Sequence, residues 1–367
     1  MRILFIANDS TYMYNMRREM IVAMKEQGHE VSIVCEPEGY LTEWSELSIP
    51  VIFVKTGRRG TNPFRDLRLM HRYRRILKSL RPQMVFTNNI KPNAYAGMQC
   101  AALHIPYVAN VTGLGTSIEN GGLLSRLTLF LYKRGLRKAR TVFFQNESNL
   151  AFFKEKGVVS GDSKVVLLPG SGVNLQKNPA EDYPSDEQGI HVLFVGRIMR
   201  DKGIGELLCA APAIHKNHPE VFFDLVGSYD DLSYRPLIEK LQEEGVLRYH
   251  GTSKCVHEFM KKAHVIVSPS YHEGLSNVLL EAAASARPIL ASDVHGCRET
   301  LIDGESGMLF TPGDAGSLTE ALNSFLALTN EARAEMGRKG HAFVAQHFDR
   351  QTVVQKYIEE LETKEGK

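Results

Sequence analysis

Residues Pro269–Glu281 read Pro-Ser-Tyr-His-Glu-Gly-Leu-Ser-Asn-Val-Leu-Leu-Glu and join a short apolar run to a segment rich in leucine and alanine. The run His264–Val267 ends at a serine and a proline, which predicts a short buried strand. The segment Ser276–Ala286 predicts a helix. The polar loop between them opens that helix, so its backbone N–H groups and the positive end of the helix dipole favour a phosphate group.

Two carboxylates in this stretch have seven residues between them: Glu273 lies in the loop and Glu281 in the expected helix. An ionised carboxylate can accept two O–H donors, which suits the hydroxyl groups of a sugar or a ribose. One carboxylate could meet a ligand beside the phosphate while the other reaches along the helix face. The alternative interpretation is an ordinary amphipathic helix with a surface glutamate.

The segment from Ser270 to Ala284, followed by Arg-Pro-Ile-Leu-Ala-Ser-Asp at 287–293, resembles the Glu-x7-Glu signature of glycosyltransferases with the two-domain GT-B fold, in the large retaining group called family 4. The resemblance extends over nearly the whole chain. It implies that Glu273 contacts the donor sugar and Glu281 the ribose. It also implies that backbone N–H groups of the loop face the donor diphosphate, at Gly274, Leu275, Ser276 and Asn277.

The composition is that of an ordinary globular protein, with 367 residues, 43% hydrophobic and 23% charged residues and a net charge of +2. This length predicts two or three domains. The five cysteines are scattered and form no Cys-x-x-Cys pair, which disfavours a zinc site or a disulfide framework and is typical of a reducing cytoplasm. We expect no signal peptide and no spanning helix, and hence a soluble or peripheral protein.

The first residues predict a β-α-β unit, with strands at Arg2–Ala7 and Glu30–Cys35 and a helix at Asn15–Gln27. Such a unit pairs its strands in parallel with a right-handed crossover. The loop Asn8–Tyr14 has no glycine and lacks the Gly-x-Gly-x-x-Gly fingerprint, which disfavours a nicotinamide or flavin enzyme.

Further strands are predicted in this half at Val51–Lys55, Met84–Thr87, Tyr107–Val111, Thr141–Phe144 and Val165–Leu168. Polar loops follow three of them directly, at Thr87–Asn93, Thr112–Thr116 and Gln145–Ser148. The carboxyl ends of parallel strands form the binding crevice of an open α/β sheet, so we expect these loops to share a site, although an ordinary turn is the alternative for each. The residues expected on this acceptor side are Asn15, Asn89, Lys91, Thr112 and Gly113.

A polar, acidic and proline-containing segment, Gln176–Gln188, is the predicted domain boundary. After it the β-α alternation starts again and continues to residue 347, which predicts two doubly wound α/β domains that face each other across a cleft. We expect an acceptor-binding domain at 1–175, a donor-binding domain at 190–348 and a terminal helix at 349–367 that crosses back to the first domain. Asp349 can cap that helix, whose apolar face carries Val353, Val354, Tyr357, Ile358 and Leu361.

The loop Gly196–Gly203 follows a predicted strand and carries two cations, Arg197 and Lys202. Arginine binds phosphate oxygens in a bidentate fashion and lysine acts as a point charge. A nucleotide diphosphate leaving group needs such charges, since negative charge develops on it as the glycosidic bond breaks. The alternative is two solvated surface cations. Gly251, which precedes Thr252, resembles the base-binding turn of the family.

No cluster of histidine and aspartate has the spacing of metal ligands, and no Asp-x-Asp occurs in an open loop after a strand. We therefore expect no metal and no cofactor besides a nucleotide-sugar substrate. The two cations and the helix N-terminus can replace a metal. The family usually has a glycine pair in the first loop and a histidine in the cleft. This chain has neither, with no glycine in Asn8–Asn15 and with Thr112-Gly113 where the histidine might lie.

The first half resembles a bacterial subgroup that extends polyprenyl-diphosphate-linked glycans such as capsule and O-antigen precursors. The resemblance implies a retaining transferase that moves galactose, GalNAc or GlcNAc from a UDP-sugar to a lipid-linked saccharide. The alternatives are a UDP-sugar 2-epimerase of similar fold, with Asp9 as its candidate carboxylate, and a non-catalytic sugar- or nucleic-acid-binding module. The full set of two cations and two carboxylates disfavours a module without catalysis.

Two basic segments, Lys55–Arg81 and Arg126–Arg140, lie in the half that should hold the acceptor. Anionic lipids attract lysine and arginine by about 1 kcal/mol each near the surface. Leucine and phenylalanine interleave in the second segment and would add apolar burial. We therefore expect peripheral attachment to the inner face of the cell membrane and no nucleic acid, solvated helix faces being the alternative. The basic residues expected at the membrane are Arg72, Arg74, Arg75, Lys133, Arg134 and Arg137.

Overall fold

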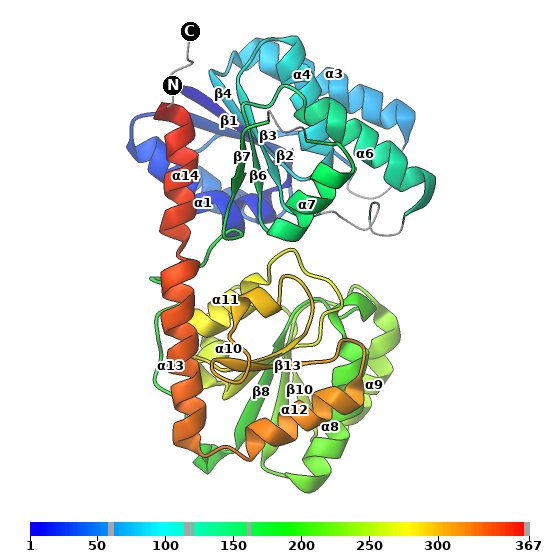
Figure 1. Ribbon diagram of the computed structural model, residues 1–367, viewed down its shortest axis with the longest axis vertical. Helices are drawn as coiled ribbons and strands as arrows, with labels where there is room; N and C mark the ends of the chain where they lie inside the picture. Colours follow the sequence, from blue (N-terminus) through cyan, green and yellow to red (C-terminus); the bar gives the residue numbers. More distant parts are fainter. Residues whose placement is uncertain (58–61, 114–117, 119–120, 160–162, 363–367) are drawn as a thin grey trace. The chain divides into compact units, whose positions relative to one another are not determined.

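The computed structural model describes residues 1–57, 62–113, 118, 121–159 and 163–362, and the chain forms two compact units (Figure 1). Unit 1 contains Met1–Ser171 and Gln351–Lys367, and unit 2 contains Gly172–Arg350. Of the predicted segments, Arg58 and Arg59 in the first basic stretch and Leu114–Thr116 in the glycine-containing turn lie outside the described residues. None of the described helices combines the length and the apolarity that a membrane-spanning segment needs.

Unit 1 is built on a seven-stranded parallel sheet in the order β3-β2-β1-β4-β5-β6-β7. Its strands are short apolar runs, as expected for a sheet that is buried on both faces. They are β1 (Arg2–Asp9), β2 (Glu30–Glu36), β3 (Val51–Phe53), β4 (Met84–Asn88), β5 (Tyr107–Val111), β6 (Thr141–Phe144) and β7 (Val165–Leu167).

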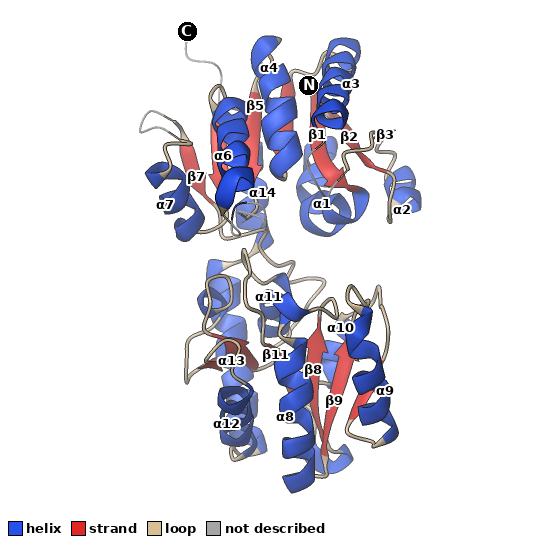
Figure 2. Ribbon diagram, turned by 90° about the vertical axis from the view of Figure 1, so that its right-hand side faces the viewer, coloured by secondary structure: helices blue, strands red, loops and turns tan. Residues whose placement is uncertain are grey.

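Helices cover both faces of this sheet (Figure 2). One face packs on α1 (Ser10–Glu26), α2 (Leu41–Glu46) and α14 (Arg350–Glu362). The other packs on α3 (Pro63–Leu80), the π-helical turn η1 (Pro92–Ala96), α4 (Gly97–Ala102), α6 (Gly122–Leu136) and α7 (Glu147–Glu155).

The last helix returns to unit 1, as predicted. Tyr357 of α14 is fully buried against the rings of Phe5, Phe86 and Phe143, with centroid distances of 6.5, 5.2 and 4.9 Å. Asn110 Nδ2 donates to its hydroxyl at 2.5 Å. The C-terminal segment therefore completes the core of the first unit.

Unit 2 repeats the architecture with a six-stranded parallel sheet in the order β10-β9-β8-β11-β12-β13. The strands are β8 (Ile190–Val195), β9 (Val221–Val226), β10 (Leu247–Tyr249), β11 (Val265–Ser268), β12 (Ile289–Ser292) and β13 (Gly307–Phe310). The prediction of two doubly wound α/β halves is thus confirmed.

One face of this second sheet packs on α8 (Ile204–Asn217), α9 (Arg235–Glu243) and α12 (Ala315–Leu326). The other packs on α10 (His257–Lys262), α11 (Asn277–Ala284) and α13 (Asn330–His347). Four short 3-10 turns lie in the connections: η2 (Asp186–Gln188), η3 (Arg200–Lys202), η4 (Leu232–Tyr234) and η5 (Arg298–Thr300).

The first loop differs from the prediction, because α1 begins at Ser10 rather than at Asn15. Asp9 caps this helix, and its side chain accepts a hydrogen bond from the N–H of Tyr12 at 2.7 Å. A capped N-terminus of this kind satisfies donors that would otherwise be left unpaired. The expected polar loop is therefore the end of a strand followed directly by a helix.

The polar segment Gln176–Gln188 packs on unit 2, and the division between the units falls before it, after Ser171. The buried guanidinium of Arg287 donates to the backbone carbonyls of Glu181 and Asp182, at 3.1 and 2.7 Å. His257 Nε2 also lies 2.9 Å from a carboxylate oxygen of Glu181. The polar composition of Gln176–Gln188 therefore reflects a segment that hydrogen bonds and ion pairs hold on unit 2.

Candidate active site

Three glycines follow the three neighbouring strands β8, β9 and β10 of unit 2, at the carboxyl edge of the sheet. Gly196 donates its N–H to Val226 O at 2.9 Å, and Gly227 donates to Gly251 O at 2.7 Å. A Cβ atom at Gly227 would lie 1.7 Å from Gly196 O, and this residue has a φ of +154°. Only glycine allows the turns to approach so closely. We predicted Gly196 and Gly251, whereas Gly227 was missed although it also follows an apolar strand.

The loop after β8 brings its two cations to this edge. The Arg197 side chain is half exposed, and its Nη1 lies 3.2 Å from Asp230 Oδ2. Lys202, in η3, pairs with Glu273. Gly203 has a φ of +66°, and a Cβ atom there would lie 1.9 Å from Pro269 O. This close backbone contact places the loop after β8 against the loop after β11.

Glu273 is held from several sides in the loop between β11 and α11. Its Oε1 accepts a hydrogen bond from Ser270 Oγ at 3.0 Å in addition to its ion pair with Lys202. A Cβ atom at Gly296 would lie 2.6 Å from Glu273 O, and Gly296 O accepts from the N–H of Ser276 at 2.7 Å. The carboxylate is therefore fixed before any ligand binds.

The bond to Gly296 corrects one expectation, because the N–H of Ser276 is occupied within the protein. Helix α11 begins at Asn277, whose side-chain Oδ1 is buried and lacks a hydrogen-bond partner among the described residues. Leu275 is buried in the core that covers this face of the sheet. Gly274 lies between Glu273 and this buried leucine.

Glu281 lies on α11, one turn beyond its start, and is half-buried. Burial raises the pKa of this carboxyl group, and the charges of Arg350 and Lys177 oppose that shift. Both basic residues belong to unit 2. A carboxylate in this position can accept hydrogen bonds from hydroxyl groups.

The carboxyl edge of the unit 1 sheet holds a buried arginine that the sequence analysis missed. Arg17 is completely buried and donates through Nε to Asn88 Oδ1 at 3.1 Å and through Nη1 to Ser171 Oγ at 2.9 Å. Its guanidinium lies 5.2 Å from the ring centroid of Tyr12. The only signal in the sequence is a cation next to a stripe of methionines, Met16, Met20 and Met24.

Several polar atoms around Arg17 are buried without a hydrogen-bond partner in the described part of the chain. They are Asn8 Oδ1, Ser10 Oγ, Arg17 Nη2, Asn88 Nδ2 and Asn110 Oδ1. These residues stand in or directly after β1, β4 and β5, except for Arg17 on α1. Buried polar groups in native proteins are normally paired, so this edge can hold ordered water or polar groups of a ligand.

The residues expected on the acceptor side are not all at this edge. Asn89 has a φ of +72°, and its Oδ1 accepts from the N–H of Asn8 at 3.1 Å. Lys91 instead contacts Gly57 O at 2.8 Å and Asp66 Oδ1 at 3.0 Å, and so ties the start of α3 to the loop after β3. Asn15 is exposed on α1, whereas Thr112 and Gly113 are half-buried directly after β5.

No cluster of three or more histidine, cysteine or acidic side chains suited to a metal ion occurs among the residues that the structure describes. Positive charge at the carboxyl edge of the unit 2 sheet is supplied by Arg197 and Lys202.

Two family models match consecutive parts of the chain. The model of the group 1 glycosyl transferases matches residues 176–343, and that of the glycosyl transferase 4-like domain matches residues 15–170. The chain belongs to the GT-B glycosyltransferases. The family expected from the Glu-x7-Glu stretch is confirmed, and the chain is an enzyme of the transferase class.

Relatives of this glycosyltransferase include a transferase that acts on a diphospho-undecaprenol-linked sugar and one of lipopolysaccharide core biosynthesis. It is 27% identical over 374 residues, or 98% of this chain and 97% of the other, to the Campylobacter jejuni N,N'-diacetylbacillosaminyl-diphospho-undecaprenol alpha-1,3-N-acetylgalactosaminyltransferase. It is 28% identical to a lipopolysaccharide core glycosyltransferase of Rhizobium meliloti, over 59% of this chain and 61% of the other. The resemblance to the bacterial subgroup is thus confirmed.

Solved structures agree on the fold of the glycosyltransferase. The Anabaena protein HepE, crystallised in complex with UDP and glucose, superposes with a TM-score of 0.80 at 19% identity, over 99% of this chain and 100% of the other. At this identity the likeness concerns the fold alone.

Proposed function

We propose that this glycosyltransferase transfers galactose, GalNAc or GlcNAc from a UDP-sugar to a polyprenyl-diphosphate-linked saccharide, with retention of the anomeric configuration. The observation that carries the proposal is the ion pair between Lys202 and Glu273, beside Arg197, at the glycine turns of unit 2. The complexes of HepE with UDP and with UDP-glucose support a uridine nucleotide as the donor.

In this proposal the donor diphosphate lies between the two cations and the start of α11. Arg197 is half exposed and can exchange Asp230 for phosphate oxygens, while Lys202 remains next to Glu273. As the glycosidic bond breaks, both cations stabilise the negative charge that develops on the leaving diphosphate. They replace a metal ion in this role. Retention follows from the family resemblance.

The two carboxylates divide the recognition of the donor. Glu273, already oriented by Ser270 and Lys202, accepts hydrogen bonds from hydroxyl groups of the sugar and supports its positive charge in the transition state. Glu281 accepts from the ribose. Ribose contacts are the same in the ground state and the transition state, so Glu281 contributes to binding rather than to turnover.

The acceptor half of the proposal rests on unit 1. The Campylobacter relative, which aligns along its whole length, acts on an undecaprenyl-diphosphate-linked sugar. A cavity of about 760 Å³ opens beside the first turns of α3. Its lining includes the carboxylates of Glu36, Glu38 and Asp66 and the exposed cations Lys55, Arg65, Arg68 and Arg72. Arginine and lysine in such a cavity suit a diphosphate group.

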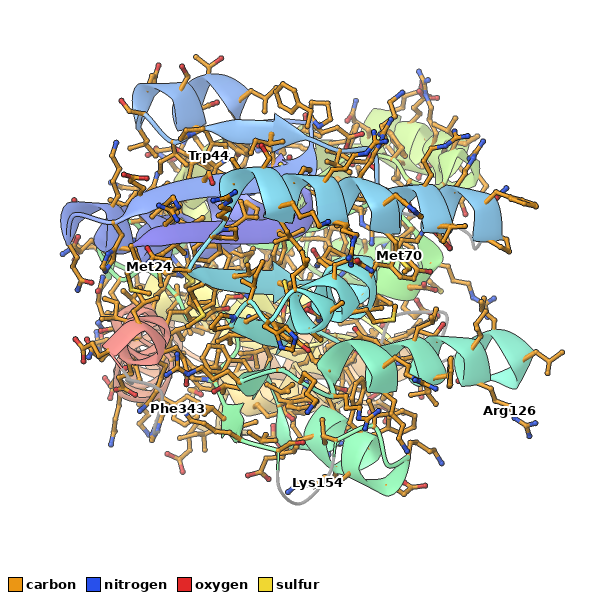
Figure 3. The ribbon with its side chains drawn as sticks, turned by 90° about the horizontal axis from the view of Figure 1, so that it is seen from above. Met24, Trp44, Met70, Arg126, Lys154 and Phe343 are labelled. Carbon is orange, nitrogen blue, oxygen red and sulfur yellow. The ribbon has the colours of Figure 1, made fainter. Side chains whose placement is uncertain are left out.

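The membrane surface would be met by the basic and apolar side chains of α3 and α6, which lie on the same side of unit 1 with α4 between them (Figure 3). Large apolar side chains are exposed on both helices: Phe64 (84%), Leu67 (54%), Leu123 (83%), Leu127 (46%) and Phe130 (53%). Exposed cations accompany them, including Arg72, Arg75, Arg126, Lys133, Arg134 and Arg137. Such a face suits the interface of an anionic bilayer.

Two residues of the expected membrane face are engaged inside the protein. Arg74 is half-buried and donates to Gln99 Oε1 at 3.2 Å. Leu136 is buried in the core under α6. The face that remains combines exposed arginine, leucine and phenylalanine in the first turns of both helices.

The function is tested by incubation with a panel of UDP-sugars and a polyprenyl-diphosphate-linked disaccharide, followed by mass spectrometry and NMR of the product. We expect transfer of one sugar with an axial linkage from an axial donor, and the same rate after treatment with EDTA. Epimerised donor without transfer, an inverted product, or activity that EDTA abolishes and manganese restores would contradict the proposal.

The roles at the donor site predict different kinetic effects. Arg197→Ala should lower kcat/KM. The expected decrease corresponds to a loss of about 2–4 kcal/mol of transition-state stabilisation, as for the loss of one preorganised charge donor. Glu281→Ala should raise the donor KM with little change in kcat. Arg200→Ala removes an exposed cation from the same loop and serves as the control, with unchanged kinetics. An unchanged donor KM in Glu281→Ala would remove the ribose assignment.

Membrane attachment predicts salt-dependent co-sedimentation with anionic vesicles. Reversal of charge at Arg68, Arg72 and Arg75 should weaken this binding by at least roughly 3 kcal/mol, on the order of 100-fold or more. Each lost cation removes about 1 kcal/mol of attraction, and the new negative charges add repulsion. The matched control reverses Lys216, Lys240 and Lys339, which are exposed on unit 2, and should leave binding close to that of the unmodified protein. Equal losses in both triple variants would show that net charge alone, and not this face, governs binding.

A further inference from the structure

The sheet of unit 2 carries polar side chains on a face where its other strands are apolar. His191 on β8, Asp224 on β9 and Arg248 on β10 line one hollow, together with His250 directly after β10. Further along the same face, α11 and α13 cover apolar side chains of β11 and β12. Strands of a parallel sheet are normally apolar on both faces, so this polar row requires an explanation.

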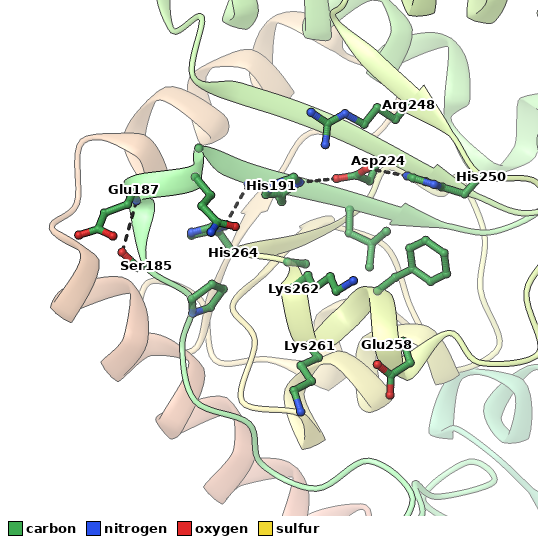
Figure 4. A pocket seen from close by; sticks show the side chains of 16 residues that line it. Ser185, Glu187, His191, Asp224, Arg248, His250, Glu258, Lys261, Lys262 and His264 are labelled. Carbon is green, nitrogen blue, oxygen red and sulfur yellow. Dashed lines mark hydrogen bonds and ion pairs between the residues drawn. The ribbon is translucent and has the colours of Figure 1, made fainter.

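The centre of the row is a carboxylate between two imidazoles (Figure 4). Asp224 is buried, and His191 Nδ1 and His250 Nε2 lie 2.7 Å from its Oδ2 and Oδ1 respectively. The two imidazoles lower the pKa of Asp224 against the opposing effect of burial, so the carboxyl group is ionised. The histidine side chains are 21% and 31% exposed, which leaves both accessible to solvent.

Cations stand on both sides of this row around a hollow of about 740 Å³. Figure 4 shows Arg248 on one side and Lys262 of α10 on the other. The guanidinium of Arg248 lies 4.5 Å from the ring centroid of Phe222, which orients it. Neither Arg248 nor Lys262 forms an ion pair with any residue that the structure describes. Two cations therefore face the hollow without an ion-pair partner among the described residues.

Four other titratable side chains line the hollow. Lys261 is paired with Glu181 at 3.3 Å, and Glu187 and Glu258 are exposed at the rim. His264 is buried and accepts the N–H of His191 at its Nδ1, and burial lowers its pKa to about 4. It therefore stays neutral, which leaves the two imidazoles beside Asp224 as the other histidines of the hollow.

These histidines couple proton uptake to the binding of an anion. An ionised carboxylate only accepts hydrogen bonds, so each neutral ring places its single proton on the nitrogen that faces Asp224. The other nitrogen, His191 Nε2 or His250 Nδ1, then carries a lone pair, which repels an anion. Protonation turns both nitrogens into donors, and Asp224 stabilises the resulting imidazolium ions.

We propose that this hollow is a second anion-binding site of the enzyme, which takes the phosphate group of a small molecule between Arg248, Lys262, His191 and His250 and gains protons as it binds. None of its residues belongs to the donor turns at Gly196, Gly227 and Gly251. The ligand class follows from the two cations without ion-pair partners and the two imidazoles, whose N–H groups can donate to the oxygens of a tetrahedral oxyanion.

The test uses sulfate, whose charge does not change between pH 6 and pH 8, so that any pH dependence of its binding belongs to the protein. Calorimetric titrations at constant ionic strength are made in an Arg197→Gln, Lys202→Gln background, which removes the donor-site cations. We expect one sulfate per chain, bound at least about tenfold more tightly at pH 6 than at pH 8. The measured binding enthalpy should change with the ionisation enthalpy of the buffer, which reports the uptake of protons. Inorganic phosphate should compete for the same site.

Variants in the same background locate the site. Arg248→Gln should weaken sulfate binding about tenfold or more at both pH values, since an exposed charge is lost without disturbance of the core. His250→Gln should retain binding at pH 8 and reduce the gain at pH 6. Arg235→Gln, on α9 of the opposite face, is the control and should bind as the background does. Binding that is unaffected by Arg248→Gln or independent of pH, or the lack of binding up to about 20 mM sulfate at pH 6, would overturn the proposal.

Discussion

The proposed donor site depends on one ion pair that joins two loops far apart in the sequence. Lys202 follows β8 and Glu273 follows β11, 71 residues later, yet their side chains meet at the same edge of the sheet. The contact exists because Gly203 packs on Pro269 and Gly296 packs on Glu273, at distances where no side chain would fit. Cation and carboxylate are therefore held in place by backbone packing, and a charged ligand meets groups that are already oriented.

The equivalent edge of the unit 1 sheet is built around a buried arginine instead. Arg17 is buried there among asparagine side chains and aromatic rings, without a carboxylate in an ion pair within the described chain. A buried polar atom without a partner costs about 1–3 kcal/mol. Several such atoms, including Asn88 Nδ2 and Asn110 Oδ1, stand together. A fold tolerates that cost where water or a substrate supplies the missing hydrogen bonds.

The sequence was most informative where local chemistry decides the structure. Apolar runs such as Tyr107–Val111 and Thr141–Phe144 have the bounds that were predicted, because strands buried on both faces need uninterrupted apolar residues. Arg197, Lys202 and Glu273 could be chosen because cations and carboxylates followed strands. Their pairing could not be predicted, since it depends on contacts between loops that only the folded sheet brings together.

Other features could not be predicted from the sequence, for physical reasons. Arg17 was missed, because nothing in the sequence shows that hydrogen bonds and aromatic rings would surround it. The start of α1 was missed because Asp9 acts as the cap in a stretch that resembles a polar loop. The N–H of Ser276 appeared available to a phosphate, but Gly296 lies close enough to accept it.

The claim that Lys202 and Glu273 act as one unit at the donor site is tested most directly by a double-mutant cycle on kcat/KM for the UDP-sugar. Lys202→Met and Glu273→Gln should each lose about 2–4 kcal/mol of transition-state stabilisation. Because each change leaves the other charge unpaired, the double variant should lose clearly less than the sum, with a coupling of about 1 kcal/mol or more. Losses that add within about 0.3 kcal/mol would show that the two residues act independently and would contradict the account.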